Sequence, residues 1–391
     1  MRSFRLHNPV QLVFGAGSAK RVGRLMQVQG MSRVLLVTGM ASAEQSGALG
    51  RVFASLEKHG VEIVRRVRLA PGPCVEDLRP HAAGLGAIHA VLGVGGGSVM
   101  DAAKILAAAP YLEDIWEPVA AGRHILKALP VFTVSTLPGS GSEVNDHALI
   151  ASREHGIKTA AKGPALFPCA SVVDPAMQVA PLELTAAAAM DAMAHVLEHY
   201  VMCRGQEAPL AVGEALMRTL LEGMRGLRQS PDALDLRADL AWAGILAQNG
   251  TMAAGSGGGE WTVHLLAHCL EARALAGAPG PAVHHAALVA ALFPAWIETV
   301  HQEAPDLFER WARVVWGLDS PLAATSAWRE EMLGWGLEPW LKGQGIDASL
   351  LRAVRQDFMA EPLGRAFRLG PLRLDELLAR AWSGLADDSP Y

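Results

Sequence analysis

The first 180 residues alternate short apolar runs with helical patterns, and this alternation limits the possible folds more than any other feature. The runs at 33–38, 61–64, 90–94 and 131–136 predict buried strands, and the segments at 43–59, 77–86 and 100–109 predict helices. Apolar strands separated by helices are typical of a parallel sheet that is covered on both faces. Right-handed crossovers would make this half a doubly wound, Rossmann-like nucleotide-binding layer.

The pattern changes at about Pro181. From there, segments rich in Ala, Leu and Met follow helical periodicity to the C-terminus, with interruptions at 250–259, 276–281 and 343–345. We therefore predict an α/β dinucleotide-binding domain at 1–180 and an all-helical metal- and substrate-binding domain at 181–391. A site in a cleft between them is expected, because ligands bind where strands of such a sheet end.

Composition argues against several classes of protein. The net charge of −5 is spread without blocks, which argues against a nucleic acid or an anionic membrane as partner. No apolar run approaches the roughly 20 residues of a membrane helix, and the first residues do not read as a signal peptide. The four cysteines show no CxxC spacing, so we expect reduced thiols in a cytoplasmic protein.

A glycine-rich stretch, GGGSVMDAAK at 95–104, follows one predicted strand and opens a helix. Consecutive glycines let backbone N–H groups approach an anion, and the helix N-terminus adds a partial positive charge, which suits a pyrophosphate. The alternative is a tight turn with Ser98 as the helix N-cap. A later stretch at 135–143, STLPGSGSE, also follows a strand and offers hydroxyl and amide groups to a cofactor. The glycine stretches at 15–20 and 255–259 are interpreted as loops.

Six of the fourteen histidines lie between His195 and His285, in about a quarter of the chain. Asp191 and His195 are four residues apart in a strongly helical stretch, which places them on one helix face. His264 and His268 repeat this spacing, and the doublet His284-His285 follows a Gly/Pro-rich loop. One carboxylate with imidazoles from separate helices suits Fe(II) or Zn(II) better than Ca²⁺ or Mg²⁺. The alternative for any single histidine is a hydrogen-bonded core residue.

The segment 195–199 also fits H-x-x-E-H, the inverted zinc-protease signature. That interpretation makes His195 and His199 the ligands and Glu198 the base of a hydrolase. It leaves Asp191 and the glycine-rich α/β half without a role, so we rank it low. Glu198 and His199 are better interpreted as groups that support the ligands or pack the helix.

Taken in order, these motifs resemble the iron-containing (group III) alcohol dehydrogenase family over nearly the whole chain. The stretch 95–104 looks like that family's GGGSxxDxAK, and 136–143 looks like its TTxGTGSE. Lys158, Pro168 and the Asp-Pro at 174–175 match a later K…P…DP pattern. D-A-x-x-H falls at 191–195 and H-x-x-x-H at 264–268. Within the family, the NADPH-dependent, butanol-dehydrogenase-like aldehyde reductases are the most similar.

The resemblance implies a dehydroquinate-synthase-like fold, a homodimer and a set of site residues. One divalent metal would be held by Asp191, His195, His264 and His285, the last chosen over His284 because it lies nine residues before Pro294. His268 would be the catalytic proton relay. The implied cofactor-binding residues are Gly39, Ser42, Gly95, Gly96, Gly97, Ser98, Asp101, Thr136, Leu137, Ser140, Ser142, Asn145 and Lys158.

Cofactor choice has a determinant after the strand at 33–38. NAD-preferring relatives usually carry an Asp there, which binds the ribose 2′-OH and repels a 2′-phosphate; this chain has Gly39. Ser42 and nearby amides are available to a phosphate, although no Arg or Lys lies beside Gly39 in the sequence. The sequence therefore favours NADP(H) over NAD(H).

The sequence thus predicts a metal-dependent oxidoreductase that transfers a hydride between NADP(H) and a small, fairly apolar primary alcohol or aldehyde. Two alternatives stay open at this point: a metal-dependent lyase of the dehydroquinate-synthase type, and a metal-free reductase of the maleylacetate type. A nucleotide-binding scaffold with an inactive site is the non-enzymatic alternative.

Overall fold

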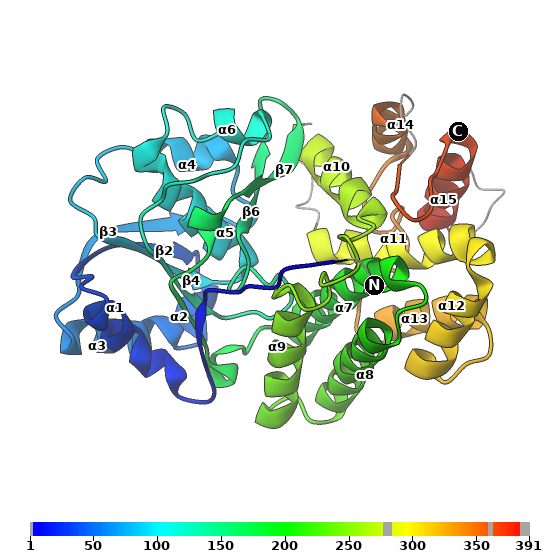
Figure 1. The fold of residues 1–391 in the computed structure, drawn as a ribbon, viewed down its shortest axis with the longest axis horizontal. Coiled ribbons are helices and arrows are strands. Elements are labelled where there is room, and N and C mark those ends of the chain that lie inside the picture. The colour runs from blue at the N-terminus through cyan, green and yellow to red at the C-terminus, as the bar shows by residue number, and fades with distance from the viewer. Residues whose placement is uncertain (1–2, 277–283, 359–362, 384–391) are drawn as a thin grey trace. The chain divides into compact units, whose positions relative to one another are not determined.

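A computed structural model of the chain describes residues 3–276, 284–358 and 363–383 (Figure 1). Its internal contacts divide the chain into two units. The α/β unit comprises His7–Pro181 and Asp232–Gly250, and the helical unit comprises the described residues within Met1–Leu6, Leu182–Pro231 and Thr251–Tyr391. The predicted division after residue 180 falls beside the junction at Pro181. The segment Asp232–Gly250, which we had expected in the helical domain, is grouped with the α/β unit.

The predicted parallel sheet is confirmed. Six parallel strands lie in the order β1-β8-β5-β4-β2-β3, and β6 and β7 form a separate antiparallel pair. The strands are β1 (Gln11–Phe14), β2 (Arg33–Gly39), β3 (Glu62–Leu69), β4 (Ala90–Gly95), β5 (Val131–Ser135), β6 (His147–Ser152), β7 (Ile157–Lys162) and β8 (Ala170–Val173). β2, β4 and β5 are almost wholly buried, which is why their sequences read as continuous apolar runs.

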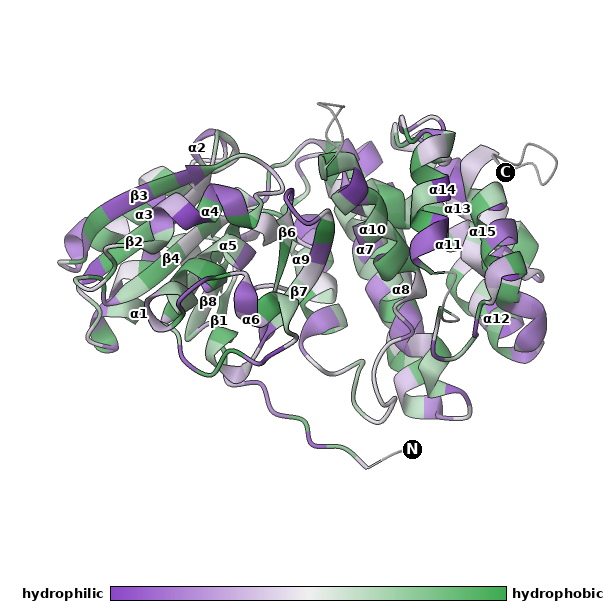
Figure 2. Ribbon diagram, turned by 90° about the horizontal axis from the view of Figure 1, so that it is seen from above, coloured by the Kyte–Doolittle hydropathy of each residue, from purple (hydrophilic) through white to green (hydrophobic). Residues whose placement is uncertain are grey.

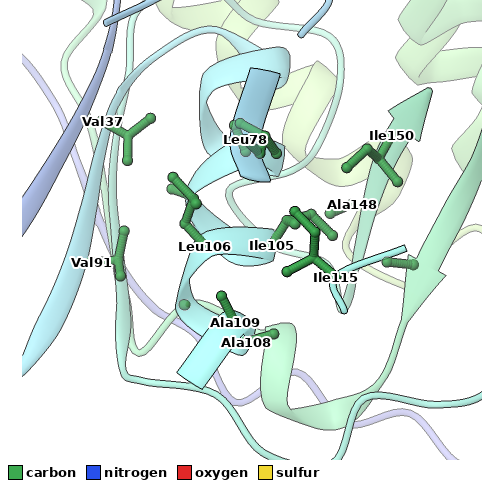
Figure 3. Packing of buried hydrophobic residues seen from close by; sticks show 14 of the residues in the cluster. Val37, Leu78, Val91, Ile105, Leu106, Ala108, Ala109, Ile115, Ala148 and Ile150 are labelled. Carbon is green, nitrogen blue, oxygen red and sulfur yellow. The ribbon is translucent and has the colours of Figure 1, made fainter. Parts of the chain in front are cut away.

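Helices cover both faces of this sheet. They are α1 (Val22–Val28), α2 (Ser42–Gln45), α3 (Ala48–Lys58), α4 (Val75–Ala82), α5 (Gly97–Ala108), α6 (Glu117–Ala120) and α9 (Leu234–Gln248). One core forms where α4, α5 and α6 pack on the sheet. Figure 3 shows Leu106 of α5 on the side of Val37 and Val91, whereas Ile105 lies beside Ile115. A second core lies under α1 and α3 on the opposite face. Ala241 and Ile245 of α9 pack against Val144 and Val173.

Several local predictions for this unit are corrected by the structure. The predicted helix at 43–59 is two helices, because Gly47 adopts a left-handed φ of 73° between them. β3 continues to Leu69, five residues beyond the predicted strand, since its arginines hide the strand pattern. The stretch at 15–20 is only partly a loop: after a turn at Gly15 and Gly17, both with positive φ, a 3-10 helix covers Ser18–Arg21 and leads into α1.

The helical unit contains no strand among its described residues, as predicted. Its helices are α7 (Leu182–Tyr200), α8 (Glu207–Gln229), α10 (Thr262–Ala276), α11 (His285–Val300), α12 (Pro305–Trp311), α13 (Pro321–Gly334), α14 (Ala348–Asp357) and α15 (Pro371–Ser383). The side chains of Trp296, Trp311 and Trp328 are fully buried in its core. The interruption predicted at 276–281 lies, from residue 277 on, outside the described residues. In the described part of the chain, no helix combines the length and apolar character needed to cross a membrane.

Candidate functional site

Three of the predicted cofactor segments end neighbouring strands of the parallel sheet. Gly39 closes β2, Gly95 closes β4, and Thr136 follows β5. Thr38 pairs with Val94, Gly95 pairs with Ser135, and the amide of Thr136 donates to the carbonyl of Gly95 at 3.0 Å. The carboxyl ends of parallel strands share one edge of a sheet, and such edges bind nucleotides. The structure therefore brings these three segments together.

The glycine turn after β4 is covered by the segment that follows β5. A Cβ added at Gly97 would lie 2.6 Å from the Cβ of Ser140, so only glycine fits this close approach. α5 begins at Gly97 with Gly96 as its N-cap, and Ser98 is an exposed residue of the first turn. The alternative in which Ser98 caps the helix is therefore wrong.

Buried charges fix the segment after β5 to α5. Asp101 accepts hydrogen bonds from the Ser142 hydroxyl at 2.6 Å and from the Leu149 amide at 3.0 Å. Lys104 donates to the Asn145 side chain at 2.8 Å and to the His147 carbonyl at 2.7 Å. Burial lowers the pKa of Lys104 to about 8, against the opposing effect of Asp101 and neighbouring carboxylates. Asp101, Ser142 and Asn145 thus shape this edge through contacts inside the protein.

The remaining predicted cofactor residues lie on three other segments. Ser42 is the first residue of α2, after the end of β2. Leu137 and Ser140 are half-buried in the turn after β5. Lys158 lies on β7, opposite Ala151 of β6. Their role in binding a cofactor stays a proposal.

The predicted metal ligands come from three helices of the helical unit. Asp191 and His195 lie one turn apart on α7, His264 lies on α10, and His285 is the first residue of α11. One ligand atom each of Asp191, His195 and His264 lies within 4.8 Å of the others. Asp191 Oδ1 is 3.4 Å from His264 Nε2 and 3.8 Å from His285 Nε2. His284 is exposed, so this geometry favours His285 over its neighbour.

Two glutamates orient the histidines of this cluster. The Nδ1 atom of His264 is 2.7 Å from Glu198 Oε2, and the Nδ1 atom of His285 is 2.7 Å from Glu271 Oε2. An ionised carboxylate can only accept, so each Nδ1 carries the hydrogen of this contact, and the Nε2 atom of each ring faces Asp191 Oδ1. The sequence predicts Glu198 as a supporting group. It does not point to Glu271, because the role of Glu271 depends on how α10 packs against α11.

The arrangement fits a bound metal ion. Asp191 Oδ1 and His264 Nε2 are both buried and have no hydrogen-bond partner among the described residues, although they face each other. When the His264 ring is neutral and its Nδ1 holds the hydrogen, Nε2 is an acceptor, and it repels the facing carboxylate oxygen unless a proton or a metal ion lies between them. Two ligand atoms held tetrahedrally at about 2.1 Å from one ion are about 3.4 Å apart. The donor set and its spacing therefore suit Fe(II) or Zn(II).

Electrostatics support the same conclusion. Burial opposes a charge on Asp191, but His195, His264 and His285 outweigh it and hold the pKa of this carboxyl well below its usual range. Burial also opposes a charge on His264, yet Glu198 and Asp191 raise its pKa to about 10. The two carboxylates thus favour a positive charge at the position of His264 Nε2. A divalent ion bound to the neutral ring would supply that charge.

His268 lies beside the cluster. Its ring is stacked 4.9 Å from the ring of His285, and it forms a second group of possible ligand atoms with His285 and Glu271. It is half-buried, whereas His264, one helical turn earlier, is buried. A position between the enclosed cluster and the exposed surface suits the predicted proton relay, which stays a proposal.

The inverted protease signature at 195–199 does not describe this geometry. Among the described residues, the cluster of ligand atoms includes His195 but not His199. Glu198 contacts His264 on another helix, and the His199 ring packs edge-on against Trp261 at 5.2 Å. Trp261 adopts a left-handed φ of 62° and also packs against the rings of His195 and His264. This tryptophan is therefore a wall of the candidate metal site.

We expect replacement of Glu198 by glutamine to weaken metal binding about 10- to 100-fold. One carboxylate oxygen accepts from the amides of Val263 and His264, and the other accepts from His264 Nδ1. In glutamine, one of these two oxygens becomes an NH₂ group, which would face an N–H donor instead of accepting from it. The His264 ring would then turn out of its present orientation. Competition with a chromophoric chelator measures the affinity.

The matched control for this substitution is Glu260→Gln. Glu260 is also buried, but it binds Thr262 and the amides of Arg365 and Ala366. Replacing Glu260 would therefore affect the stability of the fold rather than the affinity of the protein for metal. Equal metal affinities of the Glu198→Gln protein and the unaltered protein would rule out the orienting role of Glu198.

A nucleotide-type sheet edge in one unit and a carboxylate–imidazole cluster in the other define a class of metal-dependent, nucleotide-linked enzymes. Comparison with known proteins specifies the class further. Residues 9–175 match the iron-containing alcohol dehydrogenase family, and residues 185–362 match the C-terminal part of the same family. The chain belongs to the iron-containing alcohol dehydrogenase family.

Individual relatives agree with this assignment. An NADPH-dependent aldehyde reductase of Escherichia coli is 32% identical over 90% of this chain and 92% of its own length. The NADH-dependent butanol dehydrogenase B of Clostridium acetobutylicum is 28% identical over 97% of this chain and 98% of its own. The crystal structure of NADH-dependent butanol dehydrogenase A from Thermotoga maritima superimposes with a TM-score of 0.90 at 32% identity, covering 98% of this chain and 99% of that one.

These findings confirm the family, the fold class and the enzymatic nature predicted from the sequence. The chain is an NAD(P)-dependent oxidoreductase of the alcohol and aldehyde interconversion type. The family membership favours this reaction over the lyase alternative, and the cluster of Asp191, His195 and His264 argues against the metal-free one.

Proposed function

We propose that this enzyme transfers a hydride between NADP(H) and a small, fairly apolar primary alcohol or aldehyde. One divalent metal would be held by Asp191, His195, His264 and His285. The observation that carries the proposal is the pair of buried, facing acceptors, Asp191 Oδ1 and His264 Nε2, 3.4 Å apart with an orienting glutamate behind the ring.

The residues of the candidate site would have distinct roles in this reaction. When bound, the metal supplies a Lewis acid for the substrate oxygen, and the nicotinamide gives or takes the hydride. Asp191 supplies the negative charge that attracts the ion, and Glu198 and Glu271 fix the tautomers of His264 and His285. His268 would carry the proton that leaves or reaches the substrate oxygen. Trp261 would exclude water from one side of the ligand cluster.

The substrate class follows from the residues beside the ligands. α7 carries no Lys or Arg, and Arg273 of α10 is paired with Asp357. The neighbours of the ligands, such as Met190, Ala194 and Val263, are apolar and buried. A phosphorylated or polycarboxylate substrate would need cationic partners. The apolar residues beside the ligands therefore support a small, weakly polar substrate.

Cofactor preference is the finer part of the proposal. The relatives named above include both an NADPH-dependent and NADH-dependent enzymes, so they leave the preference open. In this chain, Gly39 ends β2 where a carboxylate would repel a 2′-phosphate. NADP(H) is therefore favoured.

Metal analysis of the purified enzyme, combined with oxidation of NADPH and NADH by aldehydes of increasing chain length, tests the proposal. We expect one Fe or Zn per chain, faster turnover with NADPH, and the highest kcat/KM with a short unbranched aldehyde. Full activity after removal of all metal, or no oxidation with any aldehyde, would contradict it.

A further inference from the structure

Two arginines of β3 lie beside the end of β2. Arg66 and Arg68 are two residues apart and therefore share one face of the strand. In the sheet, Arg68 pairs with Thr38, and Leu69 pairs with Gly39. β3 is the edge strand next to β2, and its hydrophilic residues are visible along it in Figure 2. The arginines are thus brought to a segment that is distant from them in the sequence.

Their side chains reach the residues that follow Gly39. A guanidinium nitrogen of Arg68 donates to the carbonyl of Met40. Arg66 forms an ion pair with Glu44 of α2 at 2.8 Å, and Arg68 lies 3.8 Å from the other oxygen of the same carboxylate. Arg66 also packs over the ring of Phe53. Both arginine side chains keep a substantial exposed surface, 32% and 45%.

We propose that Arg68, assisted by Arg66, binds the 2′-phosphate of NADP(H), with Glu44 acting as a competing anion in the same place. The inference rests on the proposed function, because it names the groups that would set the cofactor preference. No basic residue lies beside Gly39 along the chain, but in the sheet Arg68 pairs with the preceding Thr38, and Arg66 lies two residues before Arg68 on the same strand face.

The chemistry of the three groups supports this assignment. Guanidinium groups bind phosphate oxygens through pairs of charge-assisted hydrogen bonds, and a phosphomonoester carries about −1.5 to −2 charges at pH 7. Two arginines and one glutamate leave a net positive charge after Glu44 is counted. The ribose 2′-OH of NAD(H) is uncharged and gains little from that charge. The 2′-phosphate gains most, and Gly39 adds no opposing carboxylate.

Glu44 gives the pair a second property. Its carboxylate approaches both guanidinium groups and so occupies the position that an incoming phosphate would take. The phosphate must displace or share these contacts, which moderates the preference for NADP(H). Replacing Glu44 with glutamine removes the competing charge and is expected to strengthen binding of a 2′-phosphate.

The test compares 2′,5′-ADP with 5′-AMP as ligands of the full-length enzyme, by calorimetry and by inhibition of NADPH oxidation. We expect Arg68→Met to weaken 2′,5′-ADP about 10-fold or more and Arg66→Met to weaken it less, with 5′-AMP unchanged. Glu44→Gln should strengthen 2′,5′-ADP alone. The difference between the two ligands should shrink at high salt, because these groups are exposed.

The control is Arg33→Met, which removes one exposed positive charge from the start of β2, at the other end of the strand. It should leave both affinities unchanged. Equal losses for both ligands in Arg68→Met, or no loss for either, would overturn the arginine assignment while leaving the enzyme activity in place. Failure of the unaltered enzyme to bind either nucleotide or either dinucleotide would overturn the proposed function itself, and the arginine assignment with it.

Discussion

Replacing His264 with alanine is expected to remove the tightly bound metal and to lower kcat at least about a thousandfold. A Lewis acid at the substrate oxygen is worth several kcal/mol, and each 1.4 kcal/mol is about tenfold in rate. His264 is the ligand with the most support: Glu198 fixes its Nδ1, and its Nε2 faces Asp191 at 3.4 Å. The substitution also removes the imidazole donor from one buried oxygen of Glu198, while the backbone amides at 263 and 264 still bind the other oxygen. Metal content by mass spectrometry and steady-state kinetics measure both losses.

Two further variants keep this prediction distinct from a loss of folding. Asp191→Asn preserves the volume of the side chain but removes the charge that holds the ion, so it should reproduce the loss of metal. His301→Ala changes a histidine whose ring contacts the carbonyls of Ile297 and Glu298, so it should retain metal and activity. A His264→Ala enzyme that is folded, metal-loaded and fully active would exclude His264 as a ligand.

The fold could be predicted where local patterns were strong. The buried strands β2, β4 and β5 were recognised because burial on both faces leaves unbroken apolar runs. β1 and β8 were missed; each has only four residues, and β1 is partly exposed, so neither stands out as a long apolar run. β6 and β7 were missed because their sequences mix polar and apolar residues, and they form a separate two-stranded sheet. Gly47 divided a predicted helix because its left-handed conformation cannot continue one.

The candidate site, like the fold, could be predicted only where the residues form a pattern along the sequence. Asp191 and His195 could be paired from the sequence because a helix brings residues four apart onto one face. Glu271, Arg66 and Arg68 could not be found in this way. Their roles depend on contacts between different helices or strands, which no spacing in the sequence records. Ser98 was a plausible cap, but the helix begins one residue earlier, at Gly97.

An experiment distinguishes His284 from His285 as the fourth ligand, because the two adjacent residues differ in backbone conformation: His284 is an extended N-cap residue, and His285 begins α11. We expect His285→Ala to weaken metal binding by more than about 100-fold, beyond the loss typical of a supporting residue. His285 Nε2 lies 3.8 Å from Asp191 Oδ1, and Glu271 holds the opposite side of its ring. Competitive chelator titration of the purified protein measures the affinity.

His284→Ala is the matched control, since it removes the same side chain one position earlier. His284 is the exposed N-cap residue of α11, and its backbone is extended rather than helical. Exposed substitutions away from a site usually change free energies by no more than about 0.5 kcal/mol, so its metal affinity should stay within about twofold. The reverse result, with His284→Ala losing the metal and His285→Ala keeping it, would move the fourth ligand to His284. Equal and large losses in both variants would indicate that the start of α11, rather than one imidazole, holds the site together.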